Sequence, residues 1–250
     1  TSTLNNAYGI SFGVNGRSQN GGNTATNTIY GQITTTGPNA DGITVSATKA
    51  SSAGNIVVNE GGITTSGNAS YGISIVSGST NAAVANSVTN SGTISTSGPN
   101  AYGVQLNSTS GINSITNNAG ASITTSGANS DGINVTNTKN AVTINNAGTI
   151  TTTGSSAAAI RVNGAANITN SGTLNSSSAT AIAFGGTLPS GAFNTLTINN
   201  GSSINSGIAF NKASTQETLT FGGYINNNFV NAISGLNIIN AAMLAYPVHQ

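Results

Sequence analysis

The chain has 250 residues, of which only 4% are charged and 36% are hydrophobic, and its formal net charge is +1. A chain with so little charge offers no electrostatic attraction to nucleic acid or to an acidic membrane surface, so we expect neither as a partner. It contains no cysteine, which excludes disulfides and thiolate metal sites. No apolar run approaches the ~18 residues of a membrane-spanning helix, and we expect no transmembrane segment.

An aliphatic residue preceded by glycine or alanine recurs along the chain at steps of 33, 30, 31, 29, 27, 22 and 26 residues. In the early members a tyrosine or aspartate precedes the glycine, as in Tyr8-Gly9-Ile10. The aliphatic positions are Ile10, Ile43, Ile73, Val104, Ile133, Ile160, Ile182 and Ile208. A period this persistent predicts a stack of similar units rather than one globular core.

Each period contains three short segments in which apolar and polar residues alternate, as in a strand with one buried face. The first segment follows the glycine, as in residues 72–75. The second ends in an asparagine with a glycine close behind, which predicts a tight corner; these are Asn59, Asn90, Asn146, Asn170 and Asn200. The third begins four residues after that asparagine, at Ile63, Ile94, Ile150, Leu174 and Ile204.

The distance from the third segment to the next Gly-Ile segment is constant at ten residues in five instances, beginning with Ile33 and Ile43, and then falls to eight and four. Three strands and three corners per period predict an all-β fold. We expect a single-stranded right-handed parallel β-helix over residues 1–217, with about seven to eight turns of 22–33 residues. Aliphatic side chains would stack inside it, and corner asparagines would form an amide ladder. The alternative, a β-sandwich, would need hairpins with two-residue turns.

The pattern changes over residues 218–250, where the Gly-Ile motif stops. Four aromatic residues mark this segment: Phe221, Tyr224, Phe229 and Tyr246. Because the end of a β-helix exposes an unpaired strand edge, this segment is a candidate cap or docking segment. The alternative is one or two irregular last turns.

The residue before each glycine forms a column at one corner, comprising Tyr8, Asp41, Tyr71, Tyr102 and Asp131. Tyr71 and Tyr102 belong to neighbouring turns, so their rings could stack, and exposed tyrosine beside aspartate suits contacts with carbohydrate or protein. A packed, structural corner is the alternative. Asp41 and Asp131 lie three turns apart, ~14 Å at ~4.8 Å per turn, whereas paired glycosidase carboxylates are ~5–9.5 Å apart. We therefore expect no catalytic residues, cofactor or metal.

Hydroxyl residues form two further rows that should face outward, because each follows an inward-pointing aliphatic residue. The pairs are Thr34/Thr36, Thr64/Ser66, Ser95/Ser97, Thr124/Ser126 and Thr151/Thr153. A flat array of hydroxyls on a β-helix is similar to the surface of several ice-binding proteins. The alternative is that these residues only supply β-propensity and solubility.

The corner-and-strand pattern resembles passenger domains of bacterial autotransporters, which use type V secretion. The resemblance rests on Val-Thr-Asn-Ser-Gly-Thr-Ile at 88–94 and Thr-Ile-Asn-Asn-Ala-Gly-Thr-Ile at 143–150, and it covers about residues 29 to 208. It implies a β-helix that is exported through an outer-membrane barrel and serves adhesion, autoaggregation or display. Since the sequence has no barrel, we expect a cleaved passenger, a fragment or a stand-alone secreted relative.

Together these features predict a non-enzymatic, extracellular protein of a bacterial cell surface, acting in adhesion or self-association. The expected partners are further copies of the chain, in a homo-oligomer or fibre, or glycans and proteins of a host or other surface. The alternative is a structural subunit that polymerises end to end into an extracellular fibre. An ice-binding protein and a polysaccharide-cleaving enzyme are more distant alternatives.

Overall fold

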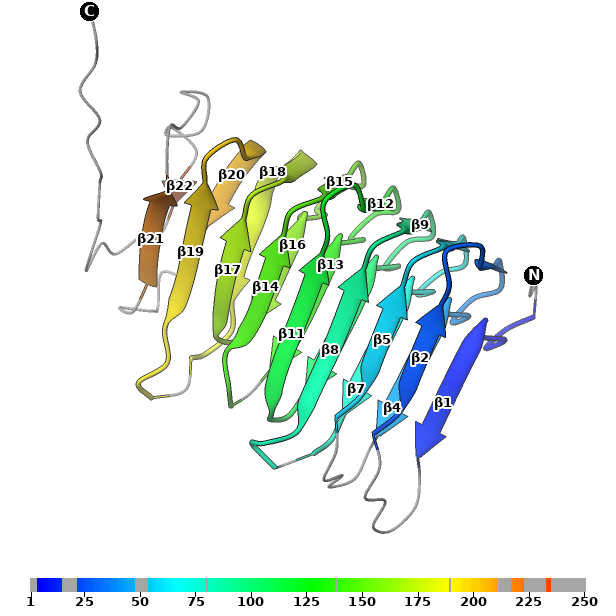
Figure 1. Cartoon of the computed structure of the whole chain (residues 1–250). Helices are drawn as coiled ribbons and strands as arrows, with labels where there is room; N and C mark the ends of the chain where they lie inside the picture. Colours follow the sequence, from blue (N-terminus) through cyan, green and yellow to red (C-terminus); the bar gives the residue numbers. More distant parts are fainter. Residues whose placement is uncertain are drawn as a thin grey trace, which may run out of the picture.

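The computed structural model describes residues 4–14, 22–47, 54–79, 81–137, 139–188, 190–210, 217–222 and 233–234. These residues form strands and no helix, and the strand pairs are parallel throughout. The chain coils into a β-solenoid of about six turns with three strands per turn, and its two described ends lie at opposite ends of the stack (Figure 1). The predicted parallel β-helix is therefore confirmed, and the uniformly parallel pairing excludes the hairpins of a β-sandwich.

The three strands of each turn belong to three stacked series. The first series comprises β1 (Ile10–Val14), β4 (Ile43–Ala47), β7 (Ile73–Ser77), β10 (Val104–Ser108), β13 (Ile133–Asn137) and β16 (Ile160–Asn163). The second comprises β2 (Thr24–Asn27), β5 (Ile56–Asn59), β8 (Ala85–Asn90), β11 (Ile112–Asn117), β14 (Val142–Asn146), β17 (Ala166–Asn170), β19 (Asn194–Asn199) and β21 (Glu217–Gly222). The third comprises β3 (Gln32–Thr35), β6 (Gly62–Thr65), β9 (Thr93–Thr96), β12 (Ser122–Thr125) and β15 (Thr149–Thr152), followed by β18 (Thr173–Gly185), β20 (Ser203–Ala209) and β22 (Ile233–Ser234).

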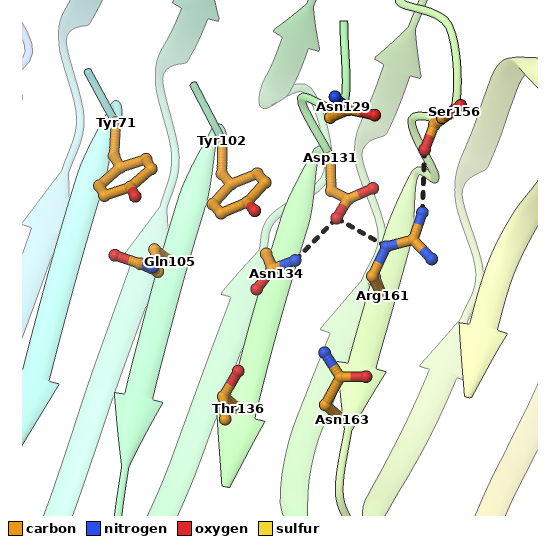
Figure 2. Close-up of a pocket in the computed structure, with 10 residues that line it drawn as sticks. All are labelled: Tyr71, Tyr102, Gln105, Asn129, Asp131, Asn134, Thr136, Ser156, Arg161 and Asn163. Atoms are coloured by element: carbon orange, nitrogen blue, oxygen red, sulfur yellow. Dashed lines mark hydrogen bonds and ion pairs between the residues drawn. The ribbon is translucent and has the colours of Figure 1, made fainter. Parts of the chain in front are cut away.

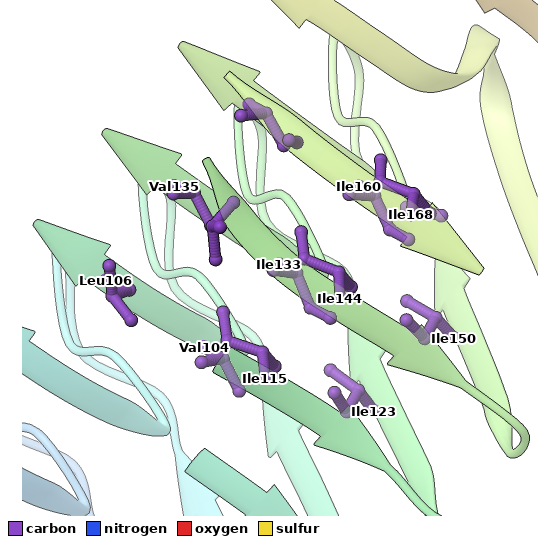
Figure 3. Packing of buried hydrophobic residues seen from close by; sticks show 14 of the residues in the cluster. Val104, Leu106, Ile115, Ile123, Ile133, Val135, Ile144, Ile150, Ile160 and Ile168 are labelled. Atoms are coloured by element: carbon purple, nitrogen blue, oxygen red, sulfur yellow. The ribbon is translucent and has the colours of Figure 1, made fainter. Parts of the chain in front are cut away.

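Aliphatic side chains fill the interior as ladders that follow the strand register. In the first series Ile73 is paired with Val104, and Val104 with Ile133. Aliphatic residues from the three series point toward one another between the strands, as Figure 3 shows for the middle turns. Since each fully buried Ile or Val contributes about 1.5–3 kcal/mol, these ladders explain how so polar a chain folds.

The Gly-Ile motif is a consequence of close packing at the corner before the first-series strands β1 to β13, and Ala159 takes the place of the glycine before β16. A Cβ placed on Gly72 would lie 2.3 Å from Cγ2 of Ile94 and 2.5 Å from the carbonyl oxygen of Gly103. No side chain fits in that space without displacing backbone of the next turn. The motif therefore marks structural positions, and the residue before the glycine is the one that is able to vary.

The predicted asparagine ladder exists, and we call it the asparagine ladder below. Each side-chain amide donates to the Oδ1 of the next member at 2.8 Å, along Asn27, Asn59, Asn90, Asn117, Asn146 and Asn170. Asn200 is not a member, which corrects the sequence alignment at this point. The register pairs Ile168 with Leu196, so Ile198 rather than an asparagine lies opposite Asn170.

A second, unpredicted amide ladder lies at the start of the second series. The Nδ2 of Asn23 donates to Oδ1 of Asn55 at 3.1 Å. In the same way Asn55 donates to Asn86, and Asn86 to Asn113, at 2.9 Å each. Asn55, Asn86 and Asn113 are buried. Each amide satisfies its neighbour, which removes the cost of burying these polar groups.

The constant ten-residue spacer builds the corner between the third and first series. Within it a buried threonine hydroxyl donates to a carbonyl five residues on, as from Thr96 Oγ1 to Ala101 O at 2.6 Å. One residue there has left-handed backbone geometry, with φ of 52° at Asn39, 53° at Asn100 and 54° at Asn129. Asparagine is among the few residues that tolerate this conformation.

The corner disappears where the spacer shortens. With only eight residues between Leu174 and Ile182, both lie in the single 13-residue strand β18, which pairs with β15 at its start and with β16 at its end. Its pairing with β20 is interrupted by register shifts after Asn175. The regular coil therefore has about six turns instead of the seven to eight that the spacing predicted.

The candidate C-terminal segment is described only in part. β21 pairs with β19 as far as Gly222, and this pairing aligns Ile198 with Phe221. The first residues after position 217 thus continue the solenoid sheet. Tyr224, Phe229 and Tyr246 lie outside the described residues. The division of the chain at residue 217, and the role of the segment after it, stay predictions.

Candidate ligand-binding groove

The residues before each glycine do form a column, and we call Tyr8, Asp41, Tyr71, Tyr102 and Asp131 the corner column. Backbone hydrogen bonds hold successive turns in register beside it, for example from Gly72 N to Tyr102 O at 3.0 Å and from Gly103 N to Asp131 O at 3.0 Å. The rings of Tyr71 and Tyr102 are stacked, with centroids 5.2 Å apart and planes 4° from parallel (Figure 2). The stacking that the sequence suggested is therefore present.

Asp131 is a buried acceptor at the corner and not an exposed surface contact. Its Oδ1 accepts from the backbone N of Ala158 at 2.7 Å, one turn further along. Its Oδ2 accepts from Asn134 Nδ2 at 2.7 Å and from Arg161 Nε at 2.9 Å. Since the Asp131 side chain is 3% exposed and that of Arg161 34%, the pair presents its cationic partner to the surface.

Asp41 makes the equivalent backbone contact, and none of the described residues forms an ion pair with it. It is buried, and its Oδ1 accepts from the backbone N of Tyr71 at 2.8 Å. Burial raises the pKa of this carboxyl from 3.8 to about 7, against the lowering effect of the hydrogen bonds from Tyr71 and Thr44. Both aspartates were candidate surface contacts, with a packed corner as the alternative; in the structure both are buried, and each accepts a hydrogen bond from a backbone N–H of the next turn.

A groove with a volume of about 520 Å³ opens where the column changes from tyrosine to aspartate. Figure 2 shows the side chains that line it across β10, β13 and β16. Two corner residues in left-handed geometry, Asn129 and Ser156, stand at its rim. The remaining lining residues are Tyr71, Tyr102, Gln105, Asp131, Asn134, Thr136, Arg161 and Asn163.

Strand register assembles the polar side of the groove. Gln105, Asn134 and Arg161 are consecutive partners on β10, β13 and β16, and Thr136 is paired with Asn163 two residues further along. Alternation along a strand turns all of them away from the core. Arg161 is fixed by two contacts, through Nε to Asp131 and through Nη2 to Ser156 O at 3.0 Å.

The phenols of the groove are held in their neutral form. Burial raises the pKa of Tyr102, and the charge of Asp131 adds to this effect while Arg161 opposes it. Burial also raises the pKa of Tyr71, with smaller contributions from Tyr102 and Asp41. The groove therefore combines neutral aromatic rings, amides and hydroxyls with one internally compensated ion pair.

Sequence reasoning placed Tyr71, Tyr102 and Asp131 at one corner but missed Arg161, Gln105 and Asn134. A signal for them was available. The constant spacing aligns Ile133 with Ile160, and this register puts Arg161 beside Asn134 and within reach of Asp131. The groove itself gave no sequence signal, because it arises from the step between a large ring and a short carboxylate in adjacent turns.

The predicted hydroxyl rows are also where they were expected. Thr64, Ser66, Ser95, Ser97, Thr124, Ser126 and Thr153 are exposed, and Thr34 and Thr151 are partly so. In register, Thr64 pairs with Ser95 and Thr124 with Thr151. The rows change to asparagine at Asn175.

Neither a metal cluster nor a membrane helix is found in the part of the chain that the structure describes. No three His, Cys, Asp or Glu side chains there converge on one point. The same residues contain no helix long and apolar enough to cross a bilayer. Comparisons with protein-family models, with curated proteins and with solved structures give no match to the chain.

Proposed function

We propose that the chain is a non-enzymatic, extracellular protein of a bacterial surface that acts in adhesion or self-association. The observation that carries this proposal is the outer surface of the solenoid. Its strands present exposed Ser, Thr and Asn over successive turns, and the whole sequence is only 4% charged. Few charges means little repulsion between copies or between the protein and an uncharged surface.

The polar corner chemistry supports a structural role over a catalytic one. Asp131 has both carboxylate oxygens bound to Ala158, Asn134 and Arg161. Asp41, three turns away in the column, binds Tyr71 N. General acid and base groups must reach the substrate, and both carboxylates are buried and already accept hydrogen bonds within the chain. The extracellular bacterial setting is proposed from the resemblance of the repeat to autotransporter passenger domains.

The test is to display the chain on a non-adherent, non-aggregating bacterial strain. We expect displayed cells to settle faster and to adhere better to glycoprotein-coated surfaces than cells displaying an unrelated β-solenoid of equal length. Equal settling and equal adhesion of the two strains would refute the proposal. Added soluble chain should compete with both effects.

End-to-end association into a fibre is the second candidate, favoured by one feature of the first turn. Of the described residues, eight are large, hydrophobic and exposed, and five of them lie between positions 4 and 30: Leu4, Tyr8, Phe12, Ile29 and Tyr30. β1, β2 and β3 are also the outermost strands of their sheets. An open parallel edge beside apolar side chains is a template for a further strand.

Light scattering of the purified chain over a wide concentration range, together with electron microscopy, tests the fibre. We expect mass to grow with concentration, and Phe12→Asp with Ile29→Asp to abolish the growth. A matched pair, Ile112→Asp with Phe193→Asp, places the same charges at exposed positions away from the first turn. A constant monomer mass, or equal loss in both double variants, would contradict end-to-end association.

A further inference from the structure

The aromatic part of the corner column ends at the groove. Tyr71 covers one face of the Tyr102 ring, since the planes are 4° from parallel and the centroids 5.2 Å apart. The next member of the column is Asp131, whose carboxylate is drawn to Ala158, Asn134 and Arg161. No third ring continues the stack, and Tyr102 lines the groove on the side where that ring would lie.

The walls around this position have the chemistry of a sugar site. A pyranose ring has an apolar C–H face, which packs on an aromatic ring, and a rim of hydroxyls, which need donors and acceptors. Gln105, Asn134 and Asn163 supply amides, and Thr136 supplies a hydroxyl. The amide nitrogen of Asn134 donates to Asp131, so a ligand hydroxyl would have to donate to its Oδ1.

The electrostatics favour a neutral ligand. Arg161 is the basic residue of the lining, and its Nε is bound to Asp131 at 2.9 Å, so the formal charges of the pair cancel. An anionic sugar or a nucleotide would have to compete with a buried carboxylate for this guanidinium. The neutral phenols add no charge at neutral pH, because their pKa values are raised further.

The volume fits a short saccharide. The groove measures about 520 Å³, within the range of ~300–1,000 Å³ that small-ligand sites occupy. It runs across β10, β13 and β16 along the solenoid axis, so a chain of sugar rings could extend from Tyr102 past Arg161 toward Asn163.

We propose that this groove binds a neutral pyranose-containing glycan, with one sugar ring stacked on Tyr102 and its hydroxyls bonded to the amides of Gln105, Asn134 and Asn163. This inference deepens the adhesive function proposed above and rests on it for its biological use. Binding itself is a property of the purified chain, independent of adhesion. Tyr102 and Arg161 then act as contact residues, and Asp131 positions Arg161.

Saturation-transfer NMR of the purified full chain tests the site. The probes are methyl pyranosides of glucose, galactose, mannose and N-acetylglucosamine and their trisaccharides, with methyl glucuronide and adenosine monophosphate as charged comparators. We expect transfer to at least one neutral series. No transfer to any neutral probe, or transfer to the charged comparators alone, would overturn the inference.

Variants locate the binding. Tyr102→Ala removes the platform and should weaken binding about tenfold or more, whereas Tyr102→Phe keeps the ring and should change it less than about threefold. Tyr30→Ala is the matched control, because Tyr30 is 91% exposed and lies outside the groove. If Tyr102→Ala fails to fold, as judged by circular dichroism, Thr136→Trp fills the groove from an exposed position. Undiminished binding by Thr136→Trp or by folded Tyr102→Ala would place the glycan elsewhere and refute the site.

Adhesion assays separate this inference from the proposed function. Displayed Tyr102→Ala that loses both saccharide binding and adhesion supports the two together. Loss of saccharide binding with full adhesion keeps the site and refutes its use in adhesion. A wild-type chain that binds saccharide without promoting adhesion or settling retains the site and removes the proposed function.

Discussion

The asparagine ladder repeats one residue through six turns, whereas the corner column changes residue from turn to turn in the same solenoid. In the ladder each amide between the two end members donates to one neighbour and accepts from the other, with each bond at 2.8 Å. In the column, tyrosines stack on each other and aspartates bind backbone N–H groups. Identical residues satisfy one another along a stack, whereas the change from Tyr102 to Asp131 in the column coincides with the groove.

The largest expected effect on stability comes from the titration of Asp41, which makes the corner column sensitive to pH. Because burial raises its pKa from 3.8 to about 7, the folded protein holds a proton between these values that the unfolded chain has released. The contribution of Asp41 to stability is therefore expected to be greatest below about pH 4 and to fall as pH rises toward 7, by up to about 4 kcal/mol.

Denaturant unfolding at a series of pH values measures this effect. The Asp41→Asn variant keeps an oxygen acceptor for Tyr71 N but does not titrate. We expect the free energy of unfolding of the wild type to fall relative to that of Asp41→Asn across the window. Parallel curves for the two proteins would show that Asp41 does not contribute.

Asn117→Ala tests the asparagine ladder in its middle. The change removes the acceptor for Asn90 Nδ2 and the donor to Asn146 Oδ1. Leaving buried polar groups unpaired, together with the cavity, should cost about 2–4 kcal/mol in urea unfolding. Asn145→Ala, at the exposed neighbouring position, should stay within about 0.5 kcal/mol. Equal urea midpoints for Asn117→Ala and Asn145→Ala would show that the ladder does not contribute to stability.

Asp131→Ala removes three hydrogen bonds from the corner column and should cost about 2 kcal/mol. Arg161→Gln should cost less than about 1 kcal/mol, because the guanidinium is partly solvated and its attraction is screened. Thermal and urea unfolding of the two variants gives the comparison. A larger loss for Arg161→Gln would mean that the ion pair, and not the bond to Ala158 N, holds this corner.

Tyr71→Leu should have the smallest effect. It keeps an apolar side chain but removes the stacked ring pair, which is worth about 0.5–1.5 kcal/mol. Tyr30→Leu, at a ring that is 91% exposed, should leave the unfolding midpoint unchanged. If Tyr71→Leu destabilised the chain as much as Asn117→Ala, the contrast between the two columns would fail.

Most of the fold could be predicted because β-stacking converts sequence spacing directly into register. The ten-residue spacer, the Gly-Ile motif and the corner asparagines each have a short-range cause: a tight corner, a close approach of backbones and an amide pair. The position at which the regular coil ends was harder to predict. Once the spacer shortens, Leu174 and Ile182 join one strand, and pairing from other turns decides the register of Leu196.

The candidate groove could be predicted only in part. Tyr71, Tyr102 and Asp131 follow from the repeat, but Arg161 reaches Asp131 through a long side chain whose direction the repeat leaves open. The buried amides of Asn55, Asn86 and Asn113 were missed for a related reason. Asparagine is usually found at the surface. Its burial here is favourable because an asparagine at the equivalent position of the next turn provides a hydrogen-bond partner.

The parallel solenoid, its inward aliphatic ladders and its outward hydroxyl rows could all be predicted from the sequence, because they depend on period and alternation alone. The three-dimensional packing was needed to show which polar groups are buried, which way Asp41 and Asp131 turn, and where a groove opens beside Tyr102. These outcomes depend on the size and charge of side chains brought together from different turns. The spacing of residues along the chain predicts which positions lie in successive turns. It does not predict how the side chains of adjacent turns fit together, because that fit depends on three-dimensional packing.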